Sequence, residues 1–373
     1  MFLRPIRFLI ITLILSGIQI PLVTGAMPLF VLYDMGETNG LKPVIDAFEK
    51  ASHPYALITL GKASDIFATD AHKLLAFPTK WERKARLSTD DFTRLLQTPL
   101  PTSVITGMAS HAQAQIANFY ARRHIPVYAF YDNFDDITNV PSFHPFMDEI
   151  MPSGVMYLVP SQPAADSFAA HPKTQADDIY IVGNPDLESW DQVFAETDPA
   201  ILFHTLHLSP EKPIILYAGG YGPEYEAYFP VFLKAMAKNP QYQILVTYHP
   251  KTDGDFEKKS LESLGSPSHI QIVPQDLPGV TTTSLAKIAS LFACYKSTAG
   301  IKALSKGVPV LFVAEQSYDN PAISQGLASL VSFEEDVKEA VESLLHNPTT
   351  PSLAPIGVPT DATHNIYDII KAY

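Results

Sequence analysis

Residues 283–313, TSLAKIASLFACYKSTAGIKALSKGVPVLFV, contain the clearest structural pattern in the chain. Leu285, Ile288, Ala289 and Phe292 recur at helical spacing, and residues 291–294 are typical of a short buried strand. A second helix is expected to end at Gly307, and an apolar strand follows. The uninterrupted order of helix, strand, turn, helix and strand predicts a parallel α/β crossover.

The beginning of the second helix suits an anion. Ser297 and Thr298 can cap the helix, and Gly300 keeps its first turn small. Unpaired backbone N–H groups at this positive end would attract a phosphate. An ordinary crossover with a good N-cap shows the same pattern, so the turn is a candidate only together with others.

The same alternation of strands and helices extends through the chain in two series. The first series runs from a strand at 30–33 to a strand at 179–182, and the second opens with a strand at 214–218. The pattern predicts an α/β fold in which two Rossmann-like domains face a central cleft. Residues 61–101 are expected to be largely helical.

The composition suggests where the domains begin and end. Residues 210–213 (PEKP) have the composition of a loop between two domains. We therefore expect a first domain at 27–208 and a second domain at 209–347. Residues 348–373 are predicted to form a proline-rich linker and a terminal helix.

Residues 1–26 have the layout of a signal peptide. Arg4 and Arg7 precede an apolar run at 8–20, Pro21 follows it, and small residues stand at 23–26. This predicts a protein exported to the periplasm or secreted. The alternative is an uncleaved membrane tether at residues 8–23, because that stretch is nearly long enough to span a bilayer.

The charge and cysteine content exclude some classes of function. The chain of 373 residues is 46% hydrophobic, which predicts a globular protein with a sizeable core. Its formal charge of −13 would repel nucleic acid, so no nucleic-acid partner is expected. Cys294 is the single cysteine, so the chain can form no internal disulfide.

Three turns in the second half each follow a predicted strand. Ligands of open α/β sheets bind beyond the carboxyl ends of the strands, so these turns are expected to meet at one site. Glycines can let a phosphate approach the backbone closely, and an imidazole or an ammonium can bind it. The predicted substrate-binding residues are Gly220, Tyr221, His249, Lys251, Ser297, Thr298 and Gly300.

The first half offers carboxylates in similar positions. Gly36 and Glu37 lie in the turn after the first strand, and Asp132 follows the strand at 127–130. We predict Asp132 or Glu37 as the catalytic base that deprotonates an acceptor hydroxyl. A helix cap or a solvated loop acid is the alternative for each. No ligand spacing indicates a metal site, and no cofactor is predicted.

Three segments resemble a known superfamily. They are SVITGMASHAQAQIANFYARRHIPVYAFYDNFDD at 103–136, IYIVGNPDLESW at 179–190 and KSTAGIKALSKGVPVLFV at 296–313. Together they are similar to the two-domain GT-B glycosyltransferases, nearest to the UDP-N-acetylglucosamine 2-epimerase branch. The resemblance implies a metal-independent site for a nucleotide-activated sugar between the domains. It places the diphosphate near Gly220, His249, Ser297 and Thr298, and the acceptor near the turns at Gly36 and Asp132.

The chain departs from that branch at positions the reaction needs. Lys302 stands where the superfamily commonly has a glutamate that holds the ribose, and Met108 replaces the epimerase's catalytic aspartate. The His-Arg-Arg-Glu-Asn motif is absent near residues 219–224. These departures argue against epimerisation.

Two hypotheses from different classes therefore remain. The first is a GT-B glycosyltransferase that moves a sugar or related group from a nucleotide-activated donor to a glycan or small-molecule acceptor. The second is an exported, non-catalytic protein of the same shape that binds a nucleotide or a glycan.

Overall fold

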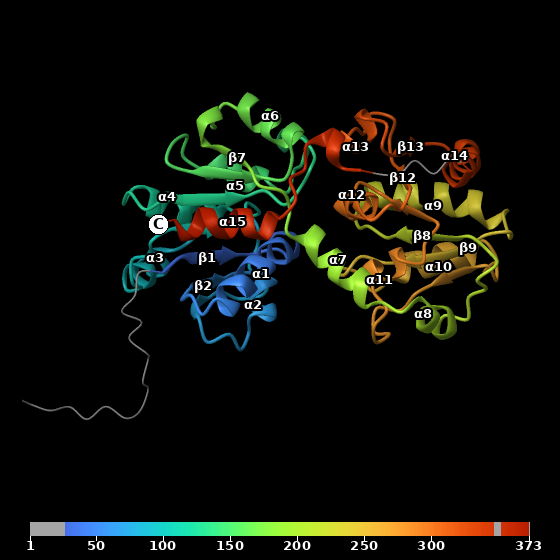
Figure 1. Ribbon diagram of the computed structural model, residues 1–373, viewed down its shortest axis with the longest axis horizontal. Coiled ribbons are helices and arrows are strands. Elements are labelled where there is room, and N and C mark those ends of the chain that lie inside the picture. The colour runs from blue at the N-terminus through green and yellow to red at the C-terminus, as the bar shows by residue number, and fades with distance from the viewer. Residues whose placement is uncertain (1–26, 347–351, 373) are drawn as a thin grey trace, which may run out of the picture.

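The computed structural model describes residues 27–346 and 352–372 and contains two parallel sheets, each in its own lobe (Figure 1). The first lobe has a seven-stranded sheet in the order β3-β2-β1-β4-β5-β6-β7. Its strands are β1 (Leu29–Leu32), β2 (Ala56–Thr59), β3 (Lys73–Ala76), β4 (Val104–Thr106), β5 (Val127–Phe130), β6 (Met156–Val159) and β7 (Ile179–Ile181).

The second lobe has a six-stranded sheet in the order β10-β9-β8-β11-β12-β13. Its strands are β8 (Ile214–Ala218), β9 (Gln243–Thr247), β10 (Ile270–Ile272), β11 (Leu291–Cys294), β12 (Val310–Val313) and β13 (Ser329–Val331). Both sheets reverse their strand order beside the first strand of the lobe, as doubly wound sheets do. The structure confirms the predicted α/β fold with two Rossmann-like domains.

Helices connect the strands and cover both faces of each sheet (Figure 1). Those of the first lobe are α1 (Met35–Lys50), α2 (Ala63–Ile66), α3 (Thr89–Leu96), α4 (His111–Ala121), α5 (His144–Glu149) and α6 (Gln162–Ala170), with 3-10 turns η1 (Ile137–Asn139) and η2 (Ala176–Asp178). Those that follow are α7 (Asp186–Glu196), α8 (Pro199–Thr205), α9 (Pro223–Ala237), α10 (Asp255–Ser263), α11 (Thr282–Ala286), α12 (Thr298–Ser305), α13 (Pro321–Ser324), α14 (Glu334–His346), η3 (Ala354–Ile356) and α15 (Ala362–Lys371).

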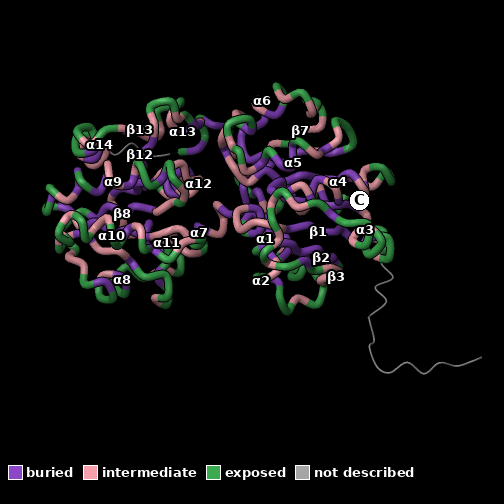
Figure 2. Tube along the Cα trace, turned by 180° about the vertical axis from the view of Figure 1, so that it is seen from behind, coloured by how far each residue is buried: buried purple, intermediate pink, exposed green. Residues whose placement is uncertain are grey.

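The strands form the core of each lobe. The central strands β1, β2, β4, β5, β8, β11 and β12 are fully buried, and Figure 2 shows this as purple trace along the centre of both lobes. Apolar clusters lie on each face of each sheet, because parallel strands are covered by helices on both sides. At about 25 cal/mol per Å² of apolar surface, this burial is the main force that stabilises the two lobes.

The structure corrects two details of the predicted elements. Residues 61–101 were expected to be largely helical, but they contain the edge strand β3, which pairs with β2. The strand is short and half-exposed, so its sequence carries no strong apolar alternation. The predicted strand at 291–294, which includes Phe292, is β11, but the helix before it ends at Ala286 and does not reach Ile288 or Ala289.

The chain returns to the first lobe after completing the second. Helix α15 packs against α1, where Ile366 and Ile370 are buried in the first lobe's core. The Asn365 side chain donates a hydrogen bond of 3.1 Å to the Val182 carbonyl at the end of β7. The first lobe is therefore built from two separate parts of the chain.

The proposed signal or anchor segment at residues 1–26 lies outside the described residues. Within the parts of the chain that the structure describes, no helix is both long and apolar enough to cross a membrane.

Candidate functional site

A cavity of about 560 Å³ lies between the two lobes. Most of its lining comes from the carboxyl ends of β8, β9, β10 and β11, where the turns of the second lobe meet. Helix α7 supplies another wall with Asp186 and Trp190, and Asn39 of α1 contributes from the first lobe. The cavity thus occupies the position at which open α/β sheets bind ligands.

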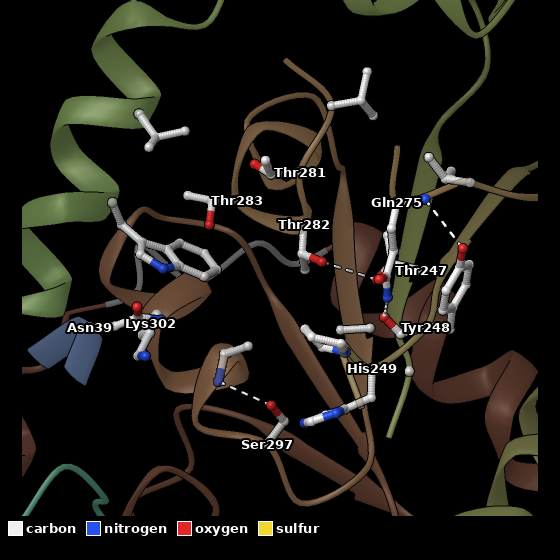
Figure 3. Close-up of a pocket in the computed structure, with 18 of the residues that line it drawn as sticks. Asn39, Thr247, Tyr248, His249, Gln275, Thr281, Thr282, Thr283, Ser297 and Lys302 are labelled. Atoms are coloured by element: carbon white, nitrogen blue, oxygen red, sulfur yellow. Dashed lines mark hydrogen bonds between the residues drawn. The ribbon is translucent and has the colours of Figure 1, made fainter. Parts of the chain in front are cut away.

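Hydroxyl groups gather at the cavity wall (Figure 3). Thr281, Thr282 and Thr283 line it at the start of α11, and the Thr282 hydroxyl donates a 3.1 Å hydrogen bond to the Thr247 hydroxyl. Ser297 lines it as the N-cap of α12, and its side chain accepts the N–H of Ala299. These hydroxyls and the positive end of α12 provide hydrogen-bond donors for a phosphate.

The predicted glycines Gly220 and Gly300 pack against aromatic rings and do not line the cavity. Gly219, the neighbour of Gly220, does line it, and a Cβ there would clash with the Thr247 carbonyl. Gly220 lies against the Tyr225 ring instead. Gly300 is buried inside α12, where a Cβ would lie 2.9 Å from the Phe312 ring.

His249 lines the cavity as a neutral imidazole. Burial and, to a lesser extent, the Lys251 ammonium lower the pKa of its ring to about 4, against the opposing charge of Asp34. Its Nδ1 accepts the backbone N–H of Lys251 at 3.1 Å. In the neutral ring the proton therefore resides on Nε2, which is a hydrogen-bond donor.

Tyr221 and Lys251 form a rim cluster with His249. The Tyr221 and His249 rings lie 4.4 Å apart between centroids, and the Lys251 Nζ lies 5.0 Å from the Tyr221 centroid. Lys251 also reaches the first lobe, where its Nζ is 3.5 Å from Asp34 Oδ2. Arg83 pairs with the same carboxylate. Burial of Asp34 is outweighed by these cations and by the Met35 N–H, so the net pKa of that carboxyl is lowered.

Lys302 couples the second lobe to α7. Its ammonium forms an ion pair with Asp186, and both side chains are about one-tenth exposed while lining the cavity. Lys302, where the sequence resemblance implies a glutamate in the superfamily, is thus a paired cation in this structure. The pair holds α12 against α7 at the back of the cavity.

Asp132 follows β5 in the first lobe and is not among the residues that line the cavity. Its carboxylate packs against Gly36, where any side chain would clash with it. Gly36 is one helical turn from Asn39, which lines the cavity. Burial raises the pKa of Asp132 to about 6, although the Lys302 ammonium opposes that shift. The group is ionised at neutral pH and can accept a proton.

Glu37 stands in a different environment, as a helix cap. It is 1% exposed, and its carboxylate accepts the N–H of Asp34 and a side-chain N–H of Gln113. Burial and the nearby Asp132 charge raise the pKa of Glu37 to about 8. A carboxyl that is protonated at neutral pH and closed off from the cavity is poorly suited to act as a base.

The acids after Asp132 have other contacts. Asp135 lies 3.5 Å from the Tyr318 hydroxyl of the second lobe, and burial raises its pKa to about 7. Asp136 caps η1 by accepting the Thr138 N–H. Neither is among the residues that line the cavity.

A group of possible metal ligands lies away from the cavity. Glu49, Asp70 and His72 of the first lobe each have a ligand atom within 4.8 Å of the others. None of the three lines the cavity, and all three already have local hydrogen bonds, including one from Tyr55 to Glu49.

The sequence patterns predicted some of the residues that line the cavity but not others. His249, Ser297 and Thr298 all line the cavity, as their positions after neighbouring strands suggest. Gln275, Trp190 and the threonines at 281–283 were not predicted. The run of three threonines before Ser284 was a usable signal, because such residues favour helix starts.

Comparison with solved structures identifies the fold as the GT-B type. UDP-GlcNAc 2-epimerase from Neisseria meningitidis bound to UDP-GlcNAc shares 14% identity at a TM-score of 0.70, covering 93% of this chain and 100% of that one. The enzyme from Methanocaldococcus jannaschii shares 16% identity at a TM-score of 0.66, with coverage of 93% and 100%. Sucrose-phosphate synthase from Thermosynechococcus elongatus shares 14% identity at a TM-score of 0.59, with coverage of 93% and 94%.

Sequence comparison points to a narrower likeness. Residues 179–348 match the protein family described as "Capsule polysaccharide biosynthesis protein". That segment covers α7, the second sheet and the cavity's main walls. No curated protein matches the chain.

Proposed function

We propose that this protein transfers a sugar or related group from a nucleotide-activated donor to a glycan or small-molecule acceptor. The observation that carries the proposal is the cavity between the lobes, where hydroxyls, the start of α12 and a neutral imidazole converge. Solved structures of this fold include one bound to UDP-GlcNAc and one with UDP, which supports a nucleotide-sugar ligand.

The diphosphate of the donor would be neutralised without a metal ion. The amides at the start of α12 and the Ser297 hydroxyl would bind its oxygens, and His249 Nε2–H would donate a further hydrogen bond. Lys251 at the rim would add a positive charge as the leaving group departs. Fixed dipoles of this kind stabilise a developing anion at little reorganisation cost.

Asp132 would act as the base that removes the acceptor's hydroxyl proton. It is ionised above about pH 6, and it packs against Gly36, which is one helical turn from Asn39 in the cavity wall. Glu37 would stabilise the turn that contains Gly36. It would not accept the proton, because Glu37 is buried and already protonated at neutral pH. The family match supports a glycan acceptor of the polysaccharide kind.

A thermal-shift screen with UDP-, CMP-, CDP- and GDP-sugars tests the proposal. One nucleotide class should raise the unfolding temperature, and release of that nucleotide should accelerate when an oligosaccharide acceptor is added. If no nucleotide sugar stabilises the protein at millimolar concentration, the cavity does not bind such a donor and the proposal is wrong.

A non-catalytic binding protein is the second candidate. Met108, fully buried, occupies the place of the epimerase aspartate, and Lys302 is paired with Asp186 where a ribose-binding glutamate is common. Stabilisation by a nucleotide sugar or a glycan without any turnover would favour this alternative.

The location of the protein is part of the proposal. Export after cleavage of residues 1–26 and tethering through residues 8–23 predict different mature N-termini. Sequencing the N-terminus of the mature protein distinguishes them.

A further inference from the structure

Two leucines are exposed at the end of the first lobe. Leu96 and Leu100 are 61% and 66% exposed, which places them among the three most exposed large apolar side chains of the described residues. They lie at the end of α3 and in the loop after it. The Thr98 hydroxyl lies 3.3 Å from the Tyr120 hydroxyl, so this loop packs against the end of α4.

Two arginines stand at the same end of α4. Arg122 and Arg123 are exposed, and within the described ranges neither has an ion-pair partner. The Arg123 guanidinium lies 3.6 Å from the Phe119 centroid, and the Phe119 ring lies 5.9 Å from Phe92 of α3. The arginines are thus beside the leucine loop, in a chain whose formal charge is −13.

This end of the lobe lies away from the second lobe and the cavity (Figure 1). The first described residue is also here, because the Met27 carbonyl accepts the Thr102 N–H at 3.0 Å. Met27 therefore lies beside Thr102, which is two residues along the chain from Leu100. The sequence before Met27 carries the apolar run at 8–20.

We propose that this α3–α4 surface, defined by Leu96, Leu100, Arg122 and Arg123, docks onto a bilayer that contains anionic lipid. The leucines would enter the interfacial region and the guanidinium groups would contact lipid phosphates. Asp90 and Asp91 lie at the other end of α3, and Asp91 is paired with Arg94. The inference does not depend on the transferase activity.

Charge favours lipid over the two other possible occupants. A second copy meeting this surface face to face would bring its own Arg122 and Arg123 against these. Residues 1–26 would bring Arg4 and Arg7 and no acid. Both arrangements place like charges together, whereas lipid phosphate complements the arginines.

A fluorescent probe at Leu100 tests this surface in the full chain. Cys294 is fully buried, and burial raises the pKa of its thiol to about 12, so a Leu100→Cys variant can be labelled selectively. Ile201→Cys, on α8 of the second lobe, is the matched control because Ile201 is 62% exposed. Both labelled proteins are mixed with phosphatidylcholine vesicles, with and without phosphatidylglycerol.

The probe at position 100 should shift its emission to the blue on vesicles that contain phosphatidylglycerol, and the probe at 201 should not. Replacing Arg122 and Arg123 by Gln should raise the vesicle concentration for half the shift at least tenfold. An unchanged probe at 100 on vesicles that sediment with the protein overturns the proposal. Equal shifts at both positions, equal shifts on pure phosphatidylcholine, or a shift caused by protein concentration alone also overturn it.

Discussion

At the residue scale, the environments of two carboxyl groups separate their roles. Asp132 and Glu37 lie close enough for the Asp132 charge to raise the pKa of Glu37. Asp132 is partly exposed with a pKa of about 6, while Glu37 is buried with a pKa of about 8. Over the interval between those values, the first is mostly ionised and the second mostly protonated.

Asp132→Asn should lower kcat by about 10² to 10⁴ and leave the affinity for the nucleotide donor nearly unchanged, because it removes only the base. Steady-state kinetics with the donor identified by thermal shift measure both quantities. In the parent protein kcat/KM should rise with pH through about 6, as the carboxyl group loses its proton.

The control for this variant is Asp136→Asn, since Asp136 caps η1 and an asparagine can accept the same N–H. It should keep its activity and its pH profile. Equal losses in both variants would show that the acidic loop acts by its fold and not through Asp132.

Glu37 makes stability depend on pH. Its pKa is about 8 in the folded state against 4.5 for an ordinary glutamate, so the folded protein binds this proton more tightly. The stability from this group is fully present below about pH 4.5 and is lost as pH rises through about 8. In Glu37→Gln the decline in unfolding free energy between pH 5 and 9 should be smaller by at least about 1 kcal/mol. Chemical denaturation of both proteins across this range measures it, and parallel curves would contradict the raised pKa.

At the element scale, the start of α12 is the part of the cavity with the most directed dipole. Ser297 caps the helix, and Asp and Asn are equally good caps, so either can replace Ser297 without loss of the helix. The two replacements differ only in charge. They therefore separate an anion site from an ordinary helix start.

Ser297→Asp should weaken nucleotide-sugar binding at least about 100-fold, because a unit negative charge beside the diphosphate costs about 3 kcal/mol or more. Ser297→Asn should bind within about threefold of the parent. Isothermal titration with the stabilising nucleotide measures both. If the two variants bind equally, the diphosphate lies elsewhere in the cavity.

Regular elements were predictable where their sequence pattern is strong. The buried strands and the α12 crossover follow from apolar runs bounded by caps and glycines, and the structure has them at those positions. The edge strand β3 was not predictable, because its four half-exposed residues carry too little periodicity.

The candidate site was predictable in part for a similar reason. His249 and Ser297 follow strands, so the sheet itself brings them together. Trp190 and Asp186 reach the cavity from α7, whose placement depends on packing between distant segments. No local pattern indicates such a contact.

At the scale of the whole molecule, α15 couples the end of the described chain to the first lobe. Ile366→Ala should destabilise that lobe by about 2 to 5 kcal/mol, because Ile366 is fully buried. Hydrogen exchange should speed up in peptides from β1 and β5 and stay unchanged in peptides from β8 and β11. His364→Ala, at an exposed position of the same helix, is the control. Faster exchange in both lobes alike would contradict separate cores.

The position of α15 also has a consequence for biosynthesis. A ribosome releases residues 27–181, which contain every strand of the first sheet, well before residues 362–371 are translated. While the second lobe is being translated, the apolar surface of the first lobe that later contacts Ile366 and Ile370 is therefore exposed to solvent. An uncovered apolar groove of this kind is a natural target for chaperones, so the growing chain should depend on them more than the finished protein does.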